Sequence, residues 1–269
     1  MTVLSNLRKA PGPRGNAFMP ALCAAVLLLD GLTAQGVAAQ AGAGLTISAT
    51  RLIFPSASRE ASLQVYNENT YPVMVQAWVD AGDIAADPAT IDAPFVILPP
   101  LIRLQPNEAR ALRVVYSQQS LPLDRESIFW FNAQMIPPQV DHRSSNVLDV
   151  SVRIRQKIFF RPQQLVRGSA EWIENLDCRP SRQSDVVIVR CRNPTPYFAT
   201  VDRLGVVQED GLFSAPGDML APFGDMEFRL AKERAANNPD RSALAPTSKL
   251  SIAVIGDEGY VVTLTKDLP

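Results

Sequence analysis

The sequence is poor in the residues from which metal and catalytic sites are most often built. Its 269 residues include one histidine, His142, and three cysteines, with no CxxC pair. A zinc site or a histidine-dependent catalytic group therefore has few side chains to draw on. The glycine-rich nucleotide motifs, GxSxG and HExxH are absent as well. We expect no enzyme, no metal site and no cofactor.

Charge of one sign and long apolar runs are also scarce. The 26 Lys and Arg residues are scattered and nearly balanced by 27 Asp and Glu residues. A nucleic-acid-binding protein would show a basic patch or stripe instead. The only sustained apolar run, residues 17–29, is short for a transmembrane span. We therefore expect no nucleic-acid partner and no membrane insertion.

The N-terminal segment has the pattern of a cleaved secretory signal peptide. A basic start that includes Arg8, Lys9 and Arg14 precedes the apolar run, and small residues follow it. Cleavage after Ala39 fits best, and Ala39-Gln40-Ala41 is an alternative site. We expect residues 1–39 to be removed and the mature protein to be exported.

Removal of the leader takes Cys23 with it and leaves two cysteines, Cys178 and Cys191. An even number of cysteines in an oxidising compartment predicts a disulfide. The separation of thirteen positions suits the two arms of a hairpin.

The part of the mature chain before residue 163 reads as β-strands, with no convincing helical period. Pro99-Pro100 marks its fourth strand as an edge strand or one that switches sheets. Trp78 is expected in the core of a sandwich. The seven expected strands are residues 45–54, 61–67, 73–79, 95–104, 109–116, 128–136 and 146–162.

After a linker at residues 163–169, a second set of strands is expected. These strands are residues 170–175, 186–192, 200–207, 226–230, 250–255 and 260–264. Short strands separated by Pro, Asn, Asp and Ser clusters are typical of β-sandwiches. The predicted fold is all-β, with one immunoglobulin-like domain at residues 44–162 and another at residues 170–269.

The strand at residues 146–162 has a regular two-residue period. Its apolar row alternates with Asp149, Ser151, Arg153 and Arg155, and consists of Leu148, Val150, Val152 and Ile154. This pattern fits a half-buried strand that packs on its own sheet. It also fits a strand whose apolar row is offered to another protein, and the strand alone does not decide between the two.

Arg51 falls on the apolar row of the first expected strand. A lone charge there is costly unless it is exposed or paired. Either the side chain reaches solvent at the strand end, or its cation faces an anionic ligand.

Several ordered motifs resemble the periplasmic pilus chaperones of the PapD-like family. They are TRLIF at 50–54, PPLIRLQP at 99–106, LRVVY at 112–116, DRESIFWFNAQMIPP at 124–138, KIFFRP at 157–162, NPTPY at 193–197 and APF at 221–223. The resemblance covers nearly the whole mature chain.

The resemblance implies two immunoglobulin-like domains in an L or boomerang arrangement, whose cleft receives pilus or fimbrial subunits in the periplasm. Such a chaperone lends a strand to each subunit by donor-strand complementation and passes the subunit to an outer-membrane usher. Arg51 and Lys157 match the cations that anchor the subunit's C-terminal carboxylate. Leu148, Val150, Val152 and Ile154 match the donor row. No ATP is implied.

The resemblance also assigns Glu126, Arg161 and Asp257 to a charge network between the domains. The position of Cys178 and Cys191 departs from what the family would suggest. An exposed apolar donor edge would favour self-association of the free protein. The main alternative is a secreted immunoglobulin-like binding module or adhesin fragment. A fibre subunit is disfavoured, since only residues 40–44 precede the first strand, and an exported enzyme is disfavoured further.

Overall fold

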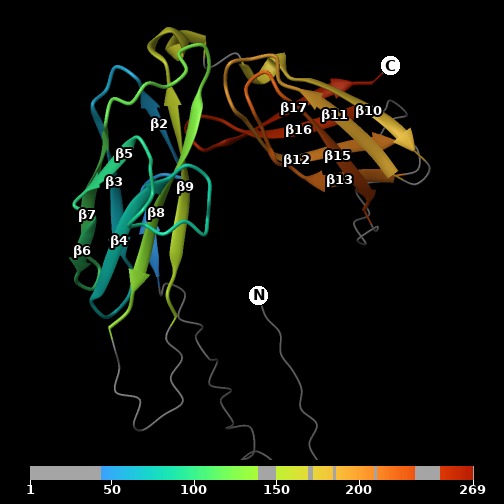
Figure 1. Cartoon of the computed structure of the whole chain (residues 1–269). Coiled ribbons are helices and arrows are strands. Elements are labelled where there is room, and N and C mark those ends of the chain that lie inside the picture. The colour runs from blue at the N-terminus through green and yellow to red at the C-terminus, as the bar shows by residue number, and fades with distance from the viewer. Residues whose placement is uncertain are drawn as a thin grey trace, which may run out of the picture. The chain divides into compact units, whose positions relative to one another are not determined.

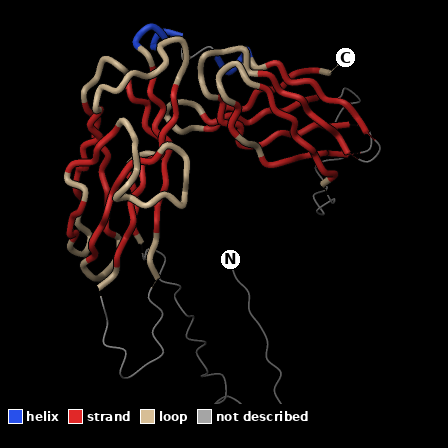
Figure 2. The backbone as a smooth tube through the Cα atoms, in the orientation of Figure 1, coloured by secondary structure: helices blue, strands red, loops and turns tan. Residues whose placement is uncertain are grey.

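The computed structural model describes residues 44–138, 150–168, 172–183, 186–208, 211–233 and 249–268. Strands make up most of this part of the chain (Figure 2), and its two helices are short 3-10 turns at Gln163–Gly168 and Trp172–Asn175. Neither of these turns, the only helical segments among the described residues, has the length or apolar character to cross a membrane. The strands form two domains, β1–β9 and β10–β17 (Figure 1), as the all-β prediction requires.

The first domain is a sandwich of a four-stranded and a five-stranded sheet. The four-stranded sheet has the order β1-β3-β7-β5, and the five-stranded sheet has the order β2-β9-β8-β4-β6. The strands are β1 (Leu45–Ile47), β2 (Arg51–Pro55), β3 (Glu60–Asn67), β4 (Val73–Asp80), β5 (Phe95–Leu98), β6 (Leu101–Leu104), β7 (Ala109–Tyr116), β8 (Ser127–Ile136) and β9 (Arg153–Arg161).

The core of the first domain lies between these two sheets. Alternate residues of each strand point inward, as Leu63 and Val65 do on β3. One end of the core is aromatic: the rings of Phe54 and Phe95 lie 5.1 Å apart, and those of Tyr116 and Phe160 lie 4.9 Å apart. These ring pairs join both sheets into one apolar cluster.

The first predicted strand, residues 45–54, is two strands in the structure. β1 pairs with β3 in one sheet, and β2 pairs in parallel with β9 in the other. The break between them shifts the alternation by one residue, so Leu52 and Phe54 face the core. The prediction that Arg51 lies on the core-facing row is therefore wrong, since Arg51 points to the opposite face of β2.

The predicted strand at residues 95–104 also divides, at Pro99 and Pro100. β5 pairs with β7, and β6 pairs with β4 in the other sheet, so the expected switch between sheets is observed. The first domain consequently has nine strands rather than the seven expected. In both divided strands the chain bends at the division and then pairs with a strand of the other sheet.

Trp78 is buried, but it does not lie in the sandwich core as predicted. The core-facing residues of β4 are Val73, Val75, Ala77 and Val79. Trp78 alternates with them and lies on the outer face of the sheet, beneath the guanidinium of Arg153 at 4.7 Å. An arginine, rather than the opposing sheet, covers the indole.

The second domain has one continuous set of paired strands, with β14 attached to β12. Its order is β10-β11-β15-β13-β12-β16-β17. The strands are β10 (Asp177–Gln183), β11 (Val186–Arg192), β12 (Ala199–Gln208), β13 (Gly211–Pro216), β14 (Met219–Leu220), β15 (Asp225–Lys232), β16 (Lys249–Ile255) and β17 (Val261–Asp267). Side chains from β11, β12, β15 and β16 share one largely aliphatic core.

Two details of the second domain differ from the prediction. The expected strand at 170–175 is wrong for residues 172–175, which form a 3-10 turn, and β10 begins at Asp177. β13 and β14 were not expected, because their short apolar segments lack a regular alternation. The predicted pairing of Cys178 with Cys191 is present, across the β10–β11 hairpin, with Cα atoms 4.0 Å apart.

Candidate functional site

Arg51 and Lys157 lie side by side on neighbouring strands. They are direct partners in the parallel pairing of β2 with β9, although 106 positions separate them in the chain. Each alternates with core residues: Leu52 follows Arg51, and Ile158 follows Lys157. Both cations therefore project from the same outer face of the sheet.

Arg51 is half-buried and incompletely satisfied. Its Nη1 donates to the carbonyl oxygen of Ile255 at 3.0 Å, and its guanidinium lies 5.9 Å from the ring of Phe159. Its buried Nε has no hydrogen-bond partner among the described residues. Burial lowers the pKa of Arg51, and the more distant charge of Asp257 opposes this change.

Lys157 has an aromatic neighbour rather than an acidic one. Its Nζ lies 5.6 Å from the ring of Trp130. Burial lowers the pKa of Lys157 and the charge of Arg51 lowers it further, while Asp218 opposes both. Within the described part of the chain, no carboxylate lies within 4.0 Å of either cation. Two adjacent, partly desolvated cations with no counter-ion among the described residues can bind an anion.

Next to this pair, β9 has an unpaired edge. β2 covers β9 from residue 157 onward, whereas residues 153–156 pair only with β8. The amide of Met135 donates to the carbonyl of Val152 at 2.8 Å. Because hydrogen-bonded pairs alternate in an antiparallel ladder, the amides of Ile154 and Gln156 face β8, and those of Arg153 and Arg155 face the open edge. That edge can accept a further strand.

The predicted donor row is only partly in strand conformation. Leu148 lies outside the described residues, and Val150 precedes the strand with 54% of its surface exposed. Val152 and Ile154 pack partly against the core of their own domain. The prediction that residues 150–152 belong to the strand is wrong, because β9 begins at Arg153. The partner strand β8 stops at Ile136, and the following prolines cannot donate ladder hydrogen bonds.

The three residues of the predicted charge network are in contact. Arg161 donates from Nε to Glu126 at 2.6 Å, and from Nη1 and Nη2 to the two oxygens of Asp257 at 2.5 and 2.9 Å. The second oxygen of Glu126 accepts the amide of Phe198 at 2.8 Å. Glu126 and Arg161 lie in the first domain, and Asp257 and Phe198 in the second, so the network links the domains.

The network is strongly charged as well as buried. Burial opposes ionisation of Arg161, but its bonds to Asp257 and Glu126 outweigh burial and raise its pKa. Burial raises the pKa of Glu126, and Arg161 opposes that rise. A buried ion pair of this kind is costly to break from one side, because the remaining charge stays buried without a partner.

Sequence reasoning missed a second polar cluster on the outer face of the same sheet. Asp80 and Asn132 are 1% and 0% exposed, and both contact arginines of β9. A sequence signal existed: each is a polar residue at an alternating position in an otherwise apolar strand. A buried polar residue of this kind needs a partner, but the pattern does not say which one.

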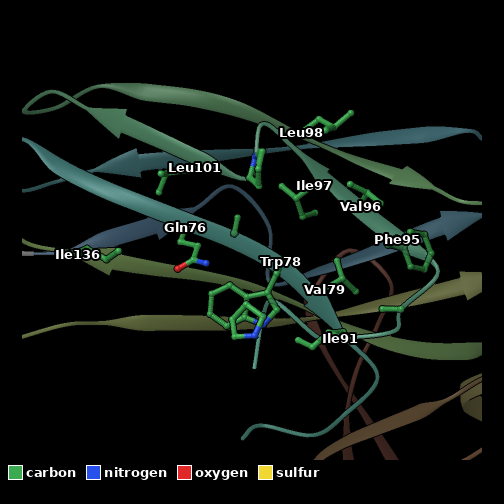
Figure 3. Close-up of a pocket in the computed structure, with 14 residues that line it drawn as sticks. Gln76, Trp78, Val79, Ile91, Phe95, Val96, Ile97, Leu98, Leu101 and Ile136 are labelled. Carbon is green, nitrogen blue, oxygen red and sulfur yellow. The ribbon is translucent and has the colours of Figure 1, made fainter. Parts of the chain in front are cut away.

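A groove on the first domain lies elsewhere. It has a volume of about 580 Å³ and borders β4, β5 and β6, with Gln76, Trp78, Leu101 and Ile136 along one side (Figure 3). None of its lining residues is charged. The cation pair and the open edge therefore belong to a different surface, on the side of the sheet where β2 and β9 lie.

Two family models match the chain and together span both domains. Residues 44–166 match "Pili and flagellar-assembly chaperone, PapD N-terminal domain", and residues 171–266 match "Pili assembly chaperone PapD, C-terminal domain".

Curated relatives and solved structures agree with these matches. Chaperone protein FimB/FhaD of Bordetella pertussis is 32% identical over 210 residues, which cover 76% of this chain and 85% of the relative. The probable fimbrial chaperone YadV of Escherichia coli is 31% identical over 72% of this chain and 80% of its own. The crystal structure of YadV covers 83% of this chain and 99% of its own, with a TM-score of 0.67 and 27% identity. SafB of Salmonella enterica, solved in complex with SafA pilin, has a TM-score of 0.63 at 26% identity and covers 84% of this chain and 96% of the matched chain.

Proposed function

Because this chain belongs to the PapD-like family of pilus assembly chaperones, we propose that it acts in the periplasm on fimbrial subunits. It binds each subunit by donor-strand complementation, keeps it folded and capped, and delivers it to an outer-membrane usher. The relative solved with a pilin supports subunits as the partner class. The family is one of assembly chaperones rather than enzymes, and the proposal requires neither ATP nor a cofactor.

The observation that carries this proposal is the pairing of Arg51 with Lys157 beside an open strand edge. A chain terminus that enters along this edge brings its carboxylate to two cations that lack a counter-ion in the described structure. Charge-assisted hydrogen bonds to a carboxylate are short and strong. Since the cations occupy fixed positions, they also set the register in which the incoming strand pairs.

The remaining binding energy comes from the strand itself. The amides and carbonyls on the open side of residues 153–156 provide main-chain hydrogen bonds for a subunit that lacks one strand. The apolar row Leu148, Val150, Val152 and Ile154 fills the groove left by that missing strand. Each fully buried aliphatic side chain of this size contributes roughly 1.5–3 kcal/mol. Glu126, Arg161 and Asp257 hold the two domains together rather than touching the subunit.

A second function, an immunoglobulin-like binding module for another exported ligand, uses the same fold. The two proposals differ in what the cation pair recognises. A chaperone needs the free carboxylate of a chain terminus at Arg51 and Lys157. A binding module has no requirement for that group.

The experiment is a periplasmic capture from cells that co-express the fimbrial subunits encoded by the same host. Tagged wild type is compared with the double variant Arg51→Ala, Lys157→Ala, and bound proteins are identified by mass spectrometry. We expect wild type to capture small fimbrial subunits and the double variant to lose at least 90% of them, about tenfold.

The matched control is Arg110→Ala with Arg113→Ala, which removes two exposed cations from β7 of the same domain. Its capture should equal that of wild type. Equal capture by all three proteins would refute the anchor assignment, and no subunit captured by wild type would favour the binding module.

A further inference from the structure

On the outer face of β9, two arginine side chains each lie over a tryptophan ring. Arg153 lies 4.7 Å from the ring of Trp78, and Arg155 lies 4.2 Å from the ring of Trp130. Both arginines stand on the open half of the strand, residues 153–156, and their side chains project away from the row formed by Val152 and Ile154. The indoles belong to β4 and β8, so the arginines hold β9 against the sheet from its outer side.

Asp80 is the acid on which both arginines converge. Arg155 Nη2 lies 2.5 Å from one carboxylate oxygen, and Arg153 Nη2 lies 3.5 Å from the other. Asn132 donates to Asp80 at 2.8 Å and accepts from Arg153 Nε at 3.0 Å and Nη2 at 2.7 Å. The amide of Gly82 donates to Asp80 at 2.7 Å. Two donors other than the arginines, the Asn132 side chain and the Gly82 amide, therefore hold the Asp80 carboxylate in place.

Side-chain contacts contribute more to the stability of residues 153–156, the open half of β9, than to that of the rest of the strand. Residues 157–160 pair with β2 and β8 on their two sides, whereas residues 153–156 pair with β8 alone. A strand segment with one neighbour and few main-chain hydrogen bonds opens more readily than one with two. The contacts of Arg153 and Arg155 on the outer face stabilise this segment in place of a second neighbouring strand.

We propose that Asp80 is a positioning residue that keeps the open half of β9 ordered as a strand and ready to pair with an incoming one. This inference rests on the proposed function for its purpose, but the ordering itself is a property of the free protein. Asp80 does not touch a subunit. It acts through Arg155 and Arg153, whose backbone amides face the open edge.

The first test is residue-level amide hydrogen exchange of the free exported protein with Asp80→Asn. The reporters are the amides of Ile154 and Gln156, which face β8, and the references are those of Ile158 and Phe160 in the doubly paired half. We expect exchange at the reporters to accelerate roughly 100-fold, because the partly buried Arg155 loses its acid, with little change at the references. Glu60→Gln removes an exposed ion pair of the same domain and should change neither set.

Equal acceleration at reporters and references would overturn the inference, since Asp80 would then support the whole domain. Unchanged exchange at both would overturn it as well. The double variant Asp80→Asn, Arg155→Met removes the partly buried cation left without its acid, so its unfolding midpoint should return toward wild type. Its reporters should still exchange fast; restored protection would contradict a positioning role.

The second test separates this inference from the proposed function. Association of the Asp80→Asn variant with a purified fimbrial subunit should be about tenfold slower than that of Glu60→Gln. If neither variant binds a subunit, the proposed function fails. The hydrogen-exchange experiment still tests whether Asp80 orders residues 153–156. If both bind at the same rate, Asp80 has no positioning role in binding.

Discussion

The two domains each contain a turn that is closed by a buried asparagine, but they differ in their charged residues and cross-links. Asn67 in the first domain and Asn193 in the second are both buried, and each donates from Nδ2 to the carbonyl of a tyrosine four positions later. Each also accepts the amide two positions later, from Asn69 or Thr195. A buried asparagine therefore replaces main-chain pairing at equivalent turns of both domains.

Beyond this turn, the first domain carries four partly buried cations on the outer face of its five-stranded sheet. Arg51, Lys157, Arg153 and Arg155 lie on one sheet face, close to aromatic rings. The second domain instead carries a disulfide, an aliphatic core and exposed ion pairs such as Arg190 with Glu227. Exposed pairs of this kind contribute little to stability. This contrast is the reason for placing the proposed binding surface on the first domain and for treating the second as its support.

The largest effect should come from the residue that joins the two domains. Arg161→Met leaves Glu126 buried without its cation and should lower the free energy of unfolding by about 3–5 kcal/mol. It should also split urea unfolding into two transitions, one for each domain. A single transition with an unchanged midpoint would mean that the domains are coupled by other contacts. Arg110→Met, which removes an exposed cation from β7, is the control.

The disulfide should stabilise only the second domain. Cys178→Ser with Cys191→Ser removes a cross-link over thirteen positions, for which chain entropy predicts a loss of about 3 kcal/mol. Amide exchange should accelerate in β11 and β15 and stay unchanged in β3 and β7. Reduction of the wild type should reproduce the effect, and acceleration in both domains would contradict the assigned division of roles.

Asn67 and Asn193 should each contribute the same amount to the free energy of unfolding. Asn67→Ala and Asn193→Ala each orphan buried backbone groups, so each should cost about 2 kcal/mol of unfolding free energy. Gln64→Ala, at an exposed glutamine of β3, serves as a control for the loss of a side-chain amide. A difference of more than about 1.5 kcal/mol between the two variants would show that the resemblance of the turns is geometric only.

A smaller effect concerns pH. Burial favours the neutral form of Asp80, but hydrogen bonds from Arg155, Asn132 and the Gly82 amide outweigh it and lower its pKa. A lowered pKa in the folded state contributes stability above the unfolded value near 4, and this contribution is lost as the pH falls below it. The unfolding free energy of wild type, measured with urea, should therefore fall between about pH 4 and pH 2. That of Asp80→Asn should fall less over the same range. An identical pH profile would contradict the assignment.

The sequence predicts the strands of this protein better than it predicts their partners. Residues 109–116 and 128–136 are strands almost as expected, because alternation is a local property. The division of residues 45–54 was missed, since an extended chain that changes sheets keeps its apolar character. That division decides which face Arg51 occupies.

The candidate site was predicted in part, and mainly through resemblance. No local pattern pairs Arg51 with Lys157, because their contact depends on parallel register between distant strands. Cys178 and Cys191 could be paired from their number and spacing. Asp80 and Asn132 could not be assigned, since a polar residue in an apolar strand reveals that a partner exists and not that Arg155 or Arg153 is the partner.

The most direct test of the central claim compares two forms of one peptide. A synthetic peptide with the C-terminal sequence of a captured subunit is titrated into the protein as the free acid and as the carboxamide. We predict that wild type binds the acid at least about tenfold more tightly. Arg51→Ala with Lys157→Met should bind both forms alike while its unfolding midpoint stays near that of wild type. Equal affinity of wild type for acid and carboxamide would contradict the carboxylate anchor.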